Sequence, residues 1–437
     1  MADVVEVADG QAAAAAVATA GSRGALARGL GRSYGDAAQN SGGLVLRLSA
    51  SASEVVVDTQ RQTATVPGAL SIDELLRVLV PRGFFVPVTP GTRFVTIGAA
   101  IASDIHGKNH HVDGSFGNHV ETLDLLLADG SVVTIGPDRN AELFWATVGG
   151  MGLTGIVLSA TFRLIPIETS KMVVDTDRVP DLDSLLAAMS EHDDDYRYSV
   201  AWIDLLAKGR HLGRSVLTRG DHARASDLKD CDNALAYDPR QIISVPALIP
   251  PSGVLSHAAV AAFNELWYRK APNHRELEEQ SLATFFHPLD GIGAWNRLYG
   301  ARGMVQYQFV VPLDRDDVLR RVVELLSARR VPAFLAVLKR FGSGNAAPLS
   351  FPMPGWTLAL DTSSAISGLS ALFAELDKLV LDAGGRHYFA KDACLGPLTA
   401  QRGYPRLAEW QATRSSADPH RRWQSDLARR LQLLGPT

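Results

Sequence analysis

The residues best suited to bind an anion lie in a glycine-rich turn at positions 27–36, with the sequence ARGLGRSYGD. Glycine allows backbone N–H groups to approach an anion closely and to adopt positive φ angles, and the two arginines add charge. The turn therefore predicts a pyrophosphate cradle, with an ordinary tight turn as the alternative. Its spacing is not that of a Rossmann site, because Tyr34 stands where the pattern begun by Gly29 and Gly31 requires another glycine.

A second group of small residues follows Pro90, Gly91 and Thr92, in the segment VTIGAAIA at positions 95–102. Small side chains let a helix approach a ligand or a second backbone closely. Thr96 has the residue type of a helix N-cap, so we expect a helix whose N-terminus faces a phosphate. Packing of small residues without a ligand is the alternative.

A third polar segment, DIHGKNHH at positions 104–111, contains two histidines with the spacing of helical metal ligands. Gly107 separates His106 from His110, and no glutamate accompanies them, so we predict no metal site. Contacts to a cofactor and to a nearby sugar are favoured instead. Lys108 could neutralise a phosphate, although a solvated lysine is the plain alternative.

The elements that must hold these segments alternate between strands and helices in the first 170 residues. Ser71 and Glu74 form a capping-box pair that predicts a helix to Leu79, ended by Pro81 and Gly83. We expect Asn140 to cap a second helix. The expected strands here are 44–48, 55–58 and 156–167, and the second helix spans 141–148.

Residues 171–385 have an α+β pattern, and the last fifty residues return to helix. A proline-broken apolar stretch at 242–255 argues against a regular helix or central strand and suits a loop under a lid or against an apolar partner. The expected strands are 198–204, 304–311, 333–341 and 356–361, and the expected helices are 316–329, 369–383, 407–413 and 421–434.

Composition excludes several classes of protein. The formal net charge of −4 provides no basic field for nucleic acid, and the two cysteines make neither a disulfide framework nor a four-cysteine metal site, which favours a reducing compartment. Acidic residues precede the alanine run at 12–16, where a signal peptide would carry basic ones, so we expect a surface helix there. No apolar run is long enough to span a bilayer. We therefore expect a cytoplasmic or peripherally membrane-associated protein.

Three segments in this order, 27–40, 90–118 and ELFWATVGG at 142–150, resemble the FAD domain of the vanillyl-alcohol-oxidase (PCMH-type) family. The resemblance implies an α+β, two-domain FAD-binding fold whose substrate domain has an antiparallel sheet flanked by helices. It implies an FAD-binding domain of residues 1–170 and 386–437, and a substrate-binding domain of residues 171–385.

More narrowly, the chain resembles the family of flavin oxidases that act on decaprenylphosphoryl-ribose, in segments along nearly its whole length. This resemblance implies oxidation of the ribose C2 hydroxyl to a ketone, the first half of epimerisation to arabinose in actinobacterial cell-wall synthesis. A separate NADH-dependent keto-reductase would complete the reaction. An oxidase of a soluble sugar or nucleoside, with oxygen as acceptor, is the alternative. The similar segments are 27–40, 104–118, 264–270, 287–290, 306–309, 347–352 and 390–392.

The same resemblance implies the roles of individual residues. Lys391 is expected to act as base or to stabilise an alkoxide, with Gln308 and His106 beside it. The plain alternatives are a core role for Trp202 and solvent exposure for Lys339. The expected cofactor contacts are Arg28, Gly29, Leu30, Gly31, Arg32, Ser33, Tyr34, Asn40, Pro90, Gly91, Thr92, Thr96, Gly98, Ala99, Ala102, Ser103, His106, Gly107, Asn109, His110, Gly114, Ile156 and Lys391. The expected substrate contacts are Tyr34, Lys108, Gly91, Trp202, Gln308, Lys339, Phe341 and Ala359.

Some positions depart from this family. Many vanillyl-alcohol-oxidase relatives attach FAD through a histidine beside the serine of the first turn, where this chain has Arg32, so we predict non-covalent FAD. Thr357 and Ala359 replace an asparagine and a cysteine, and the cysteine is the target of nitroaromatic inhibitors. Ala336, Leu338 and Arg340 also depart from the expected pocket wall, where Arg340 would add a charge.

Overall fold

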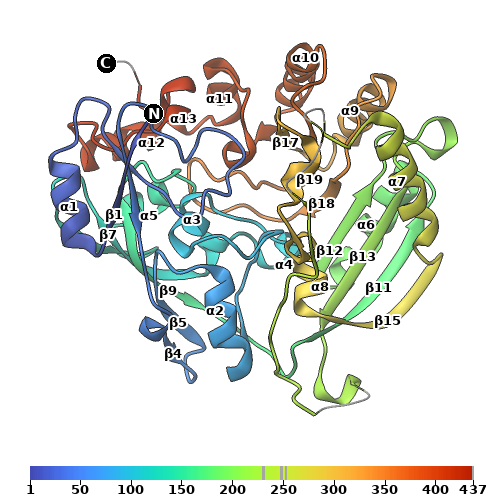
Figure 1. Cartoon of the computed structure of the whole chain (residues 1–437), viewed down its shortest axis with the longest axis horizontal. Helices are drawn as coiled ribbons and strands as arrows, with labels where there is room; N and C mark the ends of the chain where they lie inside the picture. Colours follow the sequence, from blue (N-terminus) through green and yellow to red (C-terminus); the bar gives the residue numbers. More distant parts are fainter. Residues whose placement is uncertain (229–231, 247–249, 251–252, 436–437) are drawn as a thin grey trace.

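The computed structural model describes residues 1–228, 232–246, 250 and 253–435. Two groups of sheets lie side by side (Figure 1). The first group contains a parallel sheet in the order β1-β3-β2 and an antiparallel sheet in the order β4-β5-β9-β7-β8. Its elements are β1 Asp3–Val7, α1 Gly10–Ala18, β2 Ala25–Ala27, β3 Leu44–Leu48, β4 Val56–Asp58, β5 Thr63–Pro67, α2 Ile72–Leu79, β6 Phe84–Phe85, α3 Ile97–Ala102, α4 His110–Asp113, β7 Val120–Leu126, β8 Val132–Ile135, α5 Ala141–Thr147, β9 Ile156–Arg163 and β10 Ile165–Pro166.

The second group contains an eight-stranded sheet in the order β15-β11-β13-β12-β18-β19-β17-β20, which is antiparallel in every pairing. The expected α+β class is therefore confirmed. Its elements and those that follow are β11 Lys171–Val179, α6 Leu182–His192, β12 Tyr198–Ile203, β13 Ser215–His222, β14 Ile243–Ser244, α7 His257–Lys270, β15 His274–Ser281, α8 Leu282–Phe286, β16 Ile292–Gly293, β17 Met304–Val311, α9 Asp316–Ala328, β18 Ala336–Phe341, β19 Gly355–Ser363, α10 Leu369–Asp382, β20 Arg386–His387, α11 Pro397–Gly403, α12 Leu407–Ala417 and α13 Asp426–Arg430.

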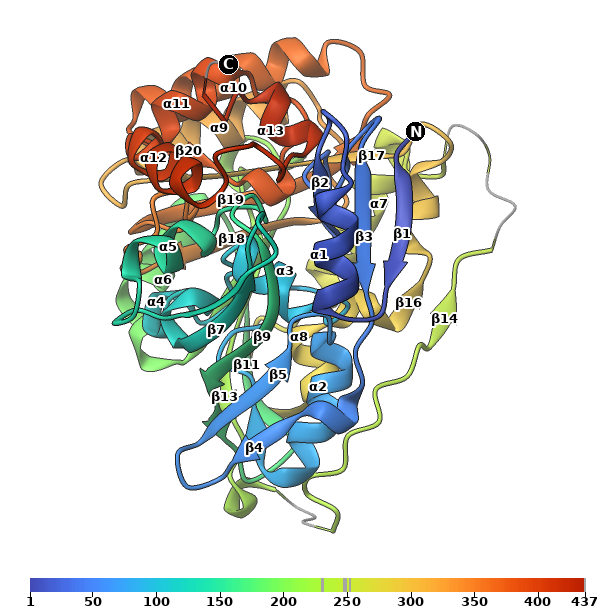
Figure 2. The same cartoon turned by 90° about the vertical axis from the view of Figure 1, so that its left-hand side faces the viewer.

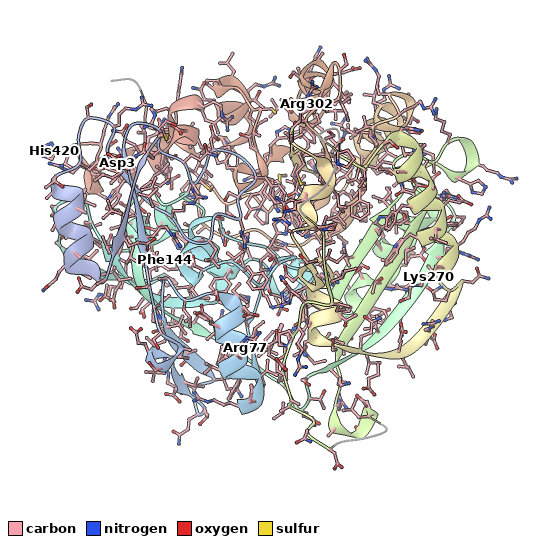
Figure 3. The ribbon with its side chains drawn as sticks, in the orientation of Figure 1. Asp3, Arg77, Phe144, Lys270, Arg302 and His420 are labelled. Carbon is pink, nitrogen blue, oxygen red and sulfur yellow. The ribbon has the colours of Figure 1, made fainter. Side chains whose placement is uncertain are left out.

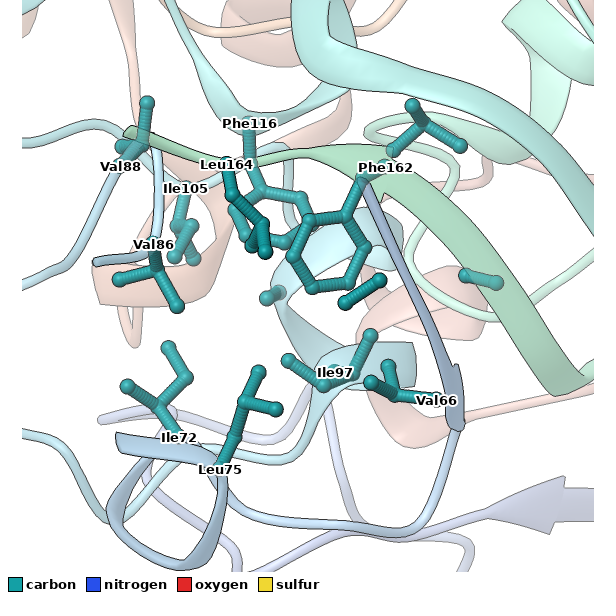
Figure 4. Close-up of a cluster of buried hydrophobic side chains, with 14 of the residues drawn as sticks. Val66, Ile72, Leu75, Val86, Val88, Ile97, Ile105, Phe116, Phe162 and Leu164 are labelled. Atoms are coloured by element: carbon teal, nitrogen blue, oxygen red, sulfur yellow. The ribbon is translucent and has the colours of Figure 1, made fainter. Parts of the chain in front are cut away.

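Helix α2 illustrates how local sequence sets these elements. The Ser71 hydroxyl accepts from the Glu74 N–H at 3.2 Å, and the Glu74 carboxylate accepts from the Ser71 N–H at 3.0 Å, so the expected capping box is confirmed. The helix buries Ile72 and Leu75 in a core that also contains Phe116 (Figure 4). Each such side chain, fully buried, contributes roughly 1.5–3 kcal/mol. Charged residues such as Lys270 lie at the periphery instead (Figure 3).

Two sequence expectations about helices are wrong in detail. Asn140 precedes α5, but it adopts a left-handed conformation with φ of 51° and its side chain makes no capping hydrogen bond. The expected helix at 421–434 is reduced to α13, because Trp423 is buried in a bridge with Ala25 rather than on a helix face. The alanine-rich helix, α1, and the remaining expected strands and helices are present with small shifts of their ends.

The eight-stranded sheet has one apolar face and one face that opens on a cavity, because side chains alternate along each strand. On β17, Tyr307 and Phe309 pack with α9 and α10 in the core, whereas Gln306 and Gln308 line the cavity. The other central strands alternate in the same way. This alternation decides which residues can reach a ligand.

The C-terminal segment returns to the N-terminal sheet (Figure 2). Backbone hydrogen bonds join Ala25 N to Arg422 O at 2.7 Å and Gln424 N to Ala25 O at 3.0 Å. The Arg430 guanidinium pairs with Asp36 at 2.6 Å and with Asp392 at 2.8 Å. The segment therefore braces both the first glycine turn and the loop that precedes α11.

We propose that residues 1–170 and 386–437 form the FAD-binding domain and that residues 171–385 form the substrate-binding domain. Strand β20 pairs with β17 at the edge of the eight-stranded sheet. The proline-broken stretch at 242–255 lies partly outside the described residues, at 247–249 and 251–252; its described start forms the short edge strand β14. Within the described chain, no helix has the length and hydropathy needed to cross a membrane.

Candidate active site

A cavity of about 900 Å³ lies between the glycine-rich turns and the open face of the eight-stranded sheet. Helices α3 and α4 lie between the two groups of sheets (Figure 1). Most of the expected site residues line this cavity: Arg28, Gly29, Leu30, Gly31, Arg32, Ser33, Tyr34, Pro90, Gly91, Thr92, Thr96, Gly98, Ala99, Ala102, Ser103, His106, Gly107, Lys108, Ile156, Trp202, Gln308, Lys339, Ala359 and Lys391.

Five expected contacts do not line the cavity, and the structure gives each a supporting position. The Asn40 amide donates to Gly24 O at 3.1 Å, and the Asn109 amide donates to Pro87 O at 2.8 Å. Gly114, with φ of 74°, ends α4. His110 and Phe341 pack against each other with ring centroids 4.3 Å apart.

The first glycine turn has the free donors that a pyrophosphate requires. Arg28 N donates to Leu46 O and Tyr34 N donates to Ala390 O, which fixes both ends of the turn. Between them, the N–H groups of residues 29–33 donate to no acceptor in the described part of the chain. Gly31 has φ of 63°, which favours glycine. Gly91, in the second glycine turn, leaves open space where a Cβ would stand. The turn thus fits the cradle that its sequence predicts.

The N-terminus of α3 does not bind a phosphate in the way that the sequence suggests. Thr96 does cap the helix, since its hydroxyl accepts from Ala99 N at 3.4 Å. However, Ile97 N donates to Leu70 O at 2.9 Å and Gly98 N donates to Gly68 O at 2.7 Å. Because the first amides are already paired, this helix offers the cavity its small side chains rather than free N–H groups.

The second glycine turn is held by residues that the sequence analysis did not select. Asp290 accepts from the Thr92 hydroxyl at 2.7 Å and from Arg93 N at 2.8 Å. His287 Nε2 lies 2.8 Å from the Thr89 hydroxyl. The segment 287–290 was part of the resemblance, so that motif could have identified Asp290 and His287 as residues that hold the second glycine turn.

His106 lies at the centre of a buried polar chain. The Thr357 hydroxyl donates to Phe309 O at 2.8 Å, so it accepts from Gln308 Nε2 at 3.1 Å. The same amide nitrogen faces His106 Nε2 at 3.1 Å and donates to it. The ring proton then resides on Nδ1, and in the described chain no group donates to Gln308 Oε1, which remains available to a ligand hydroxyl.

Lys339 completes this chain as a neutral amine. Its Nζ lies 3.0 Å from His106 Nδ1, and only an uncharged amine can accept a proton from that nitrogen. Burial lowers the pKa of Lys339 to about 7, and the charges of Lys391 and Lys108 act in the same direction. Burial also lowers the pKa of His106 well below its usual range. The plain alternative of an exposed Lys339 is therefore wrong.

Replacing Thr357 by Val should remove the acceptor that fixes the Gln308 amide. Because one net hydrogen bond is worth about 1 kcal/mol, we expect a roughly five- to tenfold fall in the rate of substrate-dependent flavin reduction, with FAD affinity unchanged. Thr362→Val is the matched control, because its hydroxyl lies on the same strand and faces Pro332 O at 3.5 Å. Equal effects of the two substitutions would contradict this assignment.

Two lysines flank the remaining cavity wall. Lys108 Nζ donates to Phe285 O at 2.6 Å and lies 4.1 Å from the Phe285 ring centroid, and burial lowers its pKa to about 7. Lys391 Nζ lies 4.1 Å from the Tyr34 ring centroid. Burial lowers the pKa of Lys391 to about 8, against the opposing charge of Asp361. The pKa of Lys391 is therefore close to neutral pH, as a general base requires.

The departures on β18 lie on the side of the sheet away from the cavity. Ala336 and Leu338 pack in the core with α9 and α10. Arg340 forms an ion pair with Asp194 at 2.9 Å and does not line the cavity. The expectation that these residues form the pocket wall is wrong, because strand alternation assigns the wall to Val337 and Lys339.

Ala359 does line the cavity, directly across the β-ladder from Gln308. We therefore expect intact-mass spectrometry to show no covalent adduct after turnover with a nitroaromatic inhibitor, and Ala359→Cys to gain the mass of one inhibitor whose nitro group has been reduced to nitroso. The exposed Cys394 provides the control, since Cys394→Ser in the Ala359→Cys background should leave the adduct intact. An adduct on the unaltered chain would contradict the expectation.

Comparison with known proteins agrees with this geometry. A family model described as "FAD binding domain" matches residues 2–136. The chain is 45% identical over 420 residues to decaprenylphosphoryl-beta-D-ribose oxidase of Mycolicibacterium smegmatis, covering 95% of this chain and 90% of the relative. It is 38% identical over 374 residues to an uncharacterized protein of Streptomyces coelicolor, covering 83% and 100%. An alditol oxidase of Streptomyces sp. is 31% identical over 144 residues, or 33% and 34% of the two chains.

The fold and the cavity define an FAD-binding oxidoreductase of the vanillyl-alcohol-oxidase type, and the free donors of the first turn fit the cofactor. The chain belongs to the family of decaprenylphosphoryl-beta-D-ribose oxidase, which it matches over nearly its whole length.

Proposed function

We propose that this protein uses FAD to oxidise the ribose C2 hydroxyl of decaprenylphosphoryl-β-D-ribose, or of a related polyprenyl-phosphate pentose, to the 2-keto sugar. This is the first half of epimerisation to arabinose, and a separate NADH-dependent keto-reductase would perform the second half. The observation that carries the proposal is the position of Lys391, Gln308 and the free turn amides around one cavity.

The residues divide the chemistry between binding and proton transfer. Backbone amides of residues 29–33 would hold the pyrophosphate, and the glycines around it admit the cofactor without covalent attachment. FAD, when bound, supplies the hydride acceptor. Lys391 takes the C2 hydroxyl proton on Nζ, and Gln308 Oε1 accepts from a sugar hydroxyl and orients the ring. Lys108 lies at the cavity wall where a phosphate charge would favour its protonated form.

An apolar rim supports a lipid-linked substrate. Trp267 and Trp295 line the cavity, and Leu266 and Trp267 on α7 are exposed. The short strand β14 exposes Ile243, two residues after the cavity residue Gln241. Aromatic and aliphatic side chains at a cavity entrance would accept a polyprenyl chain and favour peripheral contact with a membrane.

The alternative is an oxidase of a soluble sugar or nucleoside that passes electrons to oxygen. Its supporting observation is the similarity to an alditol oxidase, which covers only a third of either chain. Because the match to decaprenylphosphoryl-beta-D-ribose oxidase covers 95% of this chain and the match to the alditol oxidase covers only 33%, we favour the polyprenyl-phosphate substrate. Steady peroxide production with a free sugar would support the alternative.

The test is anaerobic mixing of the FAD-loaded protein with decaprenylphosphoryl-ribose, followed by absorbance of the oxidised flavin. We expect bleaching and a 2-keto product identified by mass spectrometry. Absence of bleaching with FAD still bound would contradict the proposed substrate and direct the search to other pentosides. Ribose 5-phosphate, which lacks the polyprenyl chain, tests whether the lipid is required.

A further inference from the structure

Asp361 is a fully buried carboxyl group beside the active site, and neither the family resemblance nor the comparisons assign it a role. It lies on β19 directly across the ladder from Gln306, whose amide donates to its Oδ1. Its Oδ2 has no partner among the described residues. A buried carboxylate oxygen without a donor is costly, so its retention calls for a charged or polar group nearby.

The cation whose charge acts on Asp361 is the amine of Lys391, which lines the same cavity as Gln306. Gln306, which donates to Asp361, lines the same cavity as Tyr34 and Lys391, and Lys391 Nζ lies over the Tyr34 ring, 4.1 Å from its centroid. Tyr299 adds a buried hydroxyl that has no partner in the described part of the chain. The cluster therefore contains Asp361, Gln306, Tyr34, Tyr299 and one cation.

We propose that Asp361 is a positioning residue that stabilises the protonated form of Lys391 during substrate oxidation. The inference rests on the proposed function. When the C2 hydroxyl gives its proton to Lys391 Nζ, the O–H bond breaks and an ammonium forms in a buried place. The Asp361 carboxylate then compensates the new charge, whereas the neutral amine of Lys339 does not. Burial raises the pKa of Asp361 to about 7, so the group is mostly a carboxylate at the pH of about 8 where Lys391 titrates, and the hydride chemistry belongs to FAD.

Other groups around Lys391 do not replace the charge of Asp361. Arg32 of the first glycine turn and Asp290 of the segment 287–290 act on Tyr34, whereas Lys339 on β18 and His106 before α4 interact electrostatically with Lys391. Of these, His106 and the Lys339 amine are neutral and cannot balance the charge of an ammonium. Asp361 is the negative group that raises the pKa of Lys391, so its removal should lower that pKa.

The experiment measures the pKa of Lys391 directly in the FAD-loaded protein by NMR of ¹³Cε-labelled lysine, with the signal assigned through Lys391→Arg. We expect Asp361→Asn to lower the pKa of Lys391 by about one unit or more, a tenfold change in proton affinity. The rising limb of flavin reduction against pH should move to lower pH by the same amount. An unchanged Lys391 pKa would overturn the proposal.

Asp193→Asn is the matched control. Asp193 is also fully buried, binds one hydroxyl through Oδ1 (Ser199, 2.6 Å) and has an unpartnered Oδ2 within the described chain, but it lies away from Lys391. It should leave the Lys391 titration unchanged. If Asp361→Asn does not fold, Gln306→Met removes the hydrogen bond that favours the Asp361 carboxylate and should lower the Lys391 pKa in the same direction.

The two proposals fail in different ways. A Lys391 pKa that responds to Asp361, together with no bleaching by decaprenylphosphoryl-ribose, would support the Asp361–Lys391 couple and refute the substrate. Bleaching by that substrate, together with a Lys391 pKa that Asp361→Asn leaves unchanged, would support the substrate and refute the Asp361–Lys391 couple.

Discussion

Replacing Lys391 by Ala should lower the rate constant of flavin reduction by decaprenylphosphoryl-ribose by about 10²–10⁴-fold, the usual contribution of a positioned general base. The substitution removes the amine that receives the C2 hydroxyl proton, but it leaves the amides of residues 29–33 in place. FAD should therefore remain bound through those amides, even though the cofactor contact expected of Lys391 is lost. Stopped-flow absorbance gives the rate, and flavin fluorescence gives the affinity.

The pH dependence of the flavin reduction rate provides a second test of Lys391 as the base. Only the neutral amine can accept a proton, and burial lowers the pKa of Lys391 to about 8. The reduction rate of the unaltered protein should thus rise as pH increases through about 8, and this limb should vanish in Lys391→Ala. Lys378→Ala, at an exposed lysine of α10, should retain both rate and pH profile. Retention of the limb in Lys391→Ala would exclude Lys391 as the base.

Replacing Asp104 by Ala should destabilise the folded protein by about 3–5 kcal/mol, because it removes the acceptor for several buried donors. Asp104 is completely buried. Its carboxylate accepts from Gly117 N at 2.9 Å, Ser115 Oγ at 2.8 Å, Asn345 Nδ2 at 2.7 Å and Ser350 Oγ at 2.5 Å. The residue also has φ of 40°, a left-handed conformation that strains alanine more than aspartate or asparagine.

Urea unfolding of the FAD-loaded protein measures this effect, and Asp104→Asn is its control. Asparagine keeps the shape and tolerates the left-handed conformation. It also avoids part of the desolvation cost that raises the pKa of the Asp104 carboxyl. We expect Asp104→Asn to lose less stability than Asp104→Ala. A loss below about 1 kcal/mol in Asp104→Ala would show that the donors find other partners.

The sequence predicted those parts of the site that depend on local composition. Glycine and arginine content identified the cradle at residues 27–36, and the resemblance identified Lys391 and Gln308. The sequence could not reveal that the first amides of α3 are already paired, since their acceptors, Leu70 O and Gly68 O, belong to an earlier loop. Residue type was sufficient where function depends on the backbone of one turn, and insufficient where it depends on distant partners.

The alternation of side chains along each strand could have predicted more of the residues that face the cavity. The sequence predicts a strand at 304–311 and the resemblance implies Gln308 as a site residue, so a period of two selects Gln306 for the same face. Because Lys339 lines the cavity, the same period of two places Arg340 on the opposite face of the sheet, away from the cavity wall. Asp361 was beyond reach, because its importance depends on the ladder register that sets it opposite Gln306.

Because the C-terminal segment packs against the N-terminal sheet, the first glycine turn cannot be fully braced until the whole chain has been synthesised. Arg430 and Asp36, whose ion pair braces the first turn, are separated by 394 positions in the chain. During synthesis, the turn emerges from the ribosome long before its partner, and contacts of such high sequence separation form late in folding. We therefore expect FAD to be loaded only after the chain is released, with the nascent N-terminal part unable to retain it.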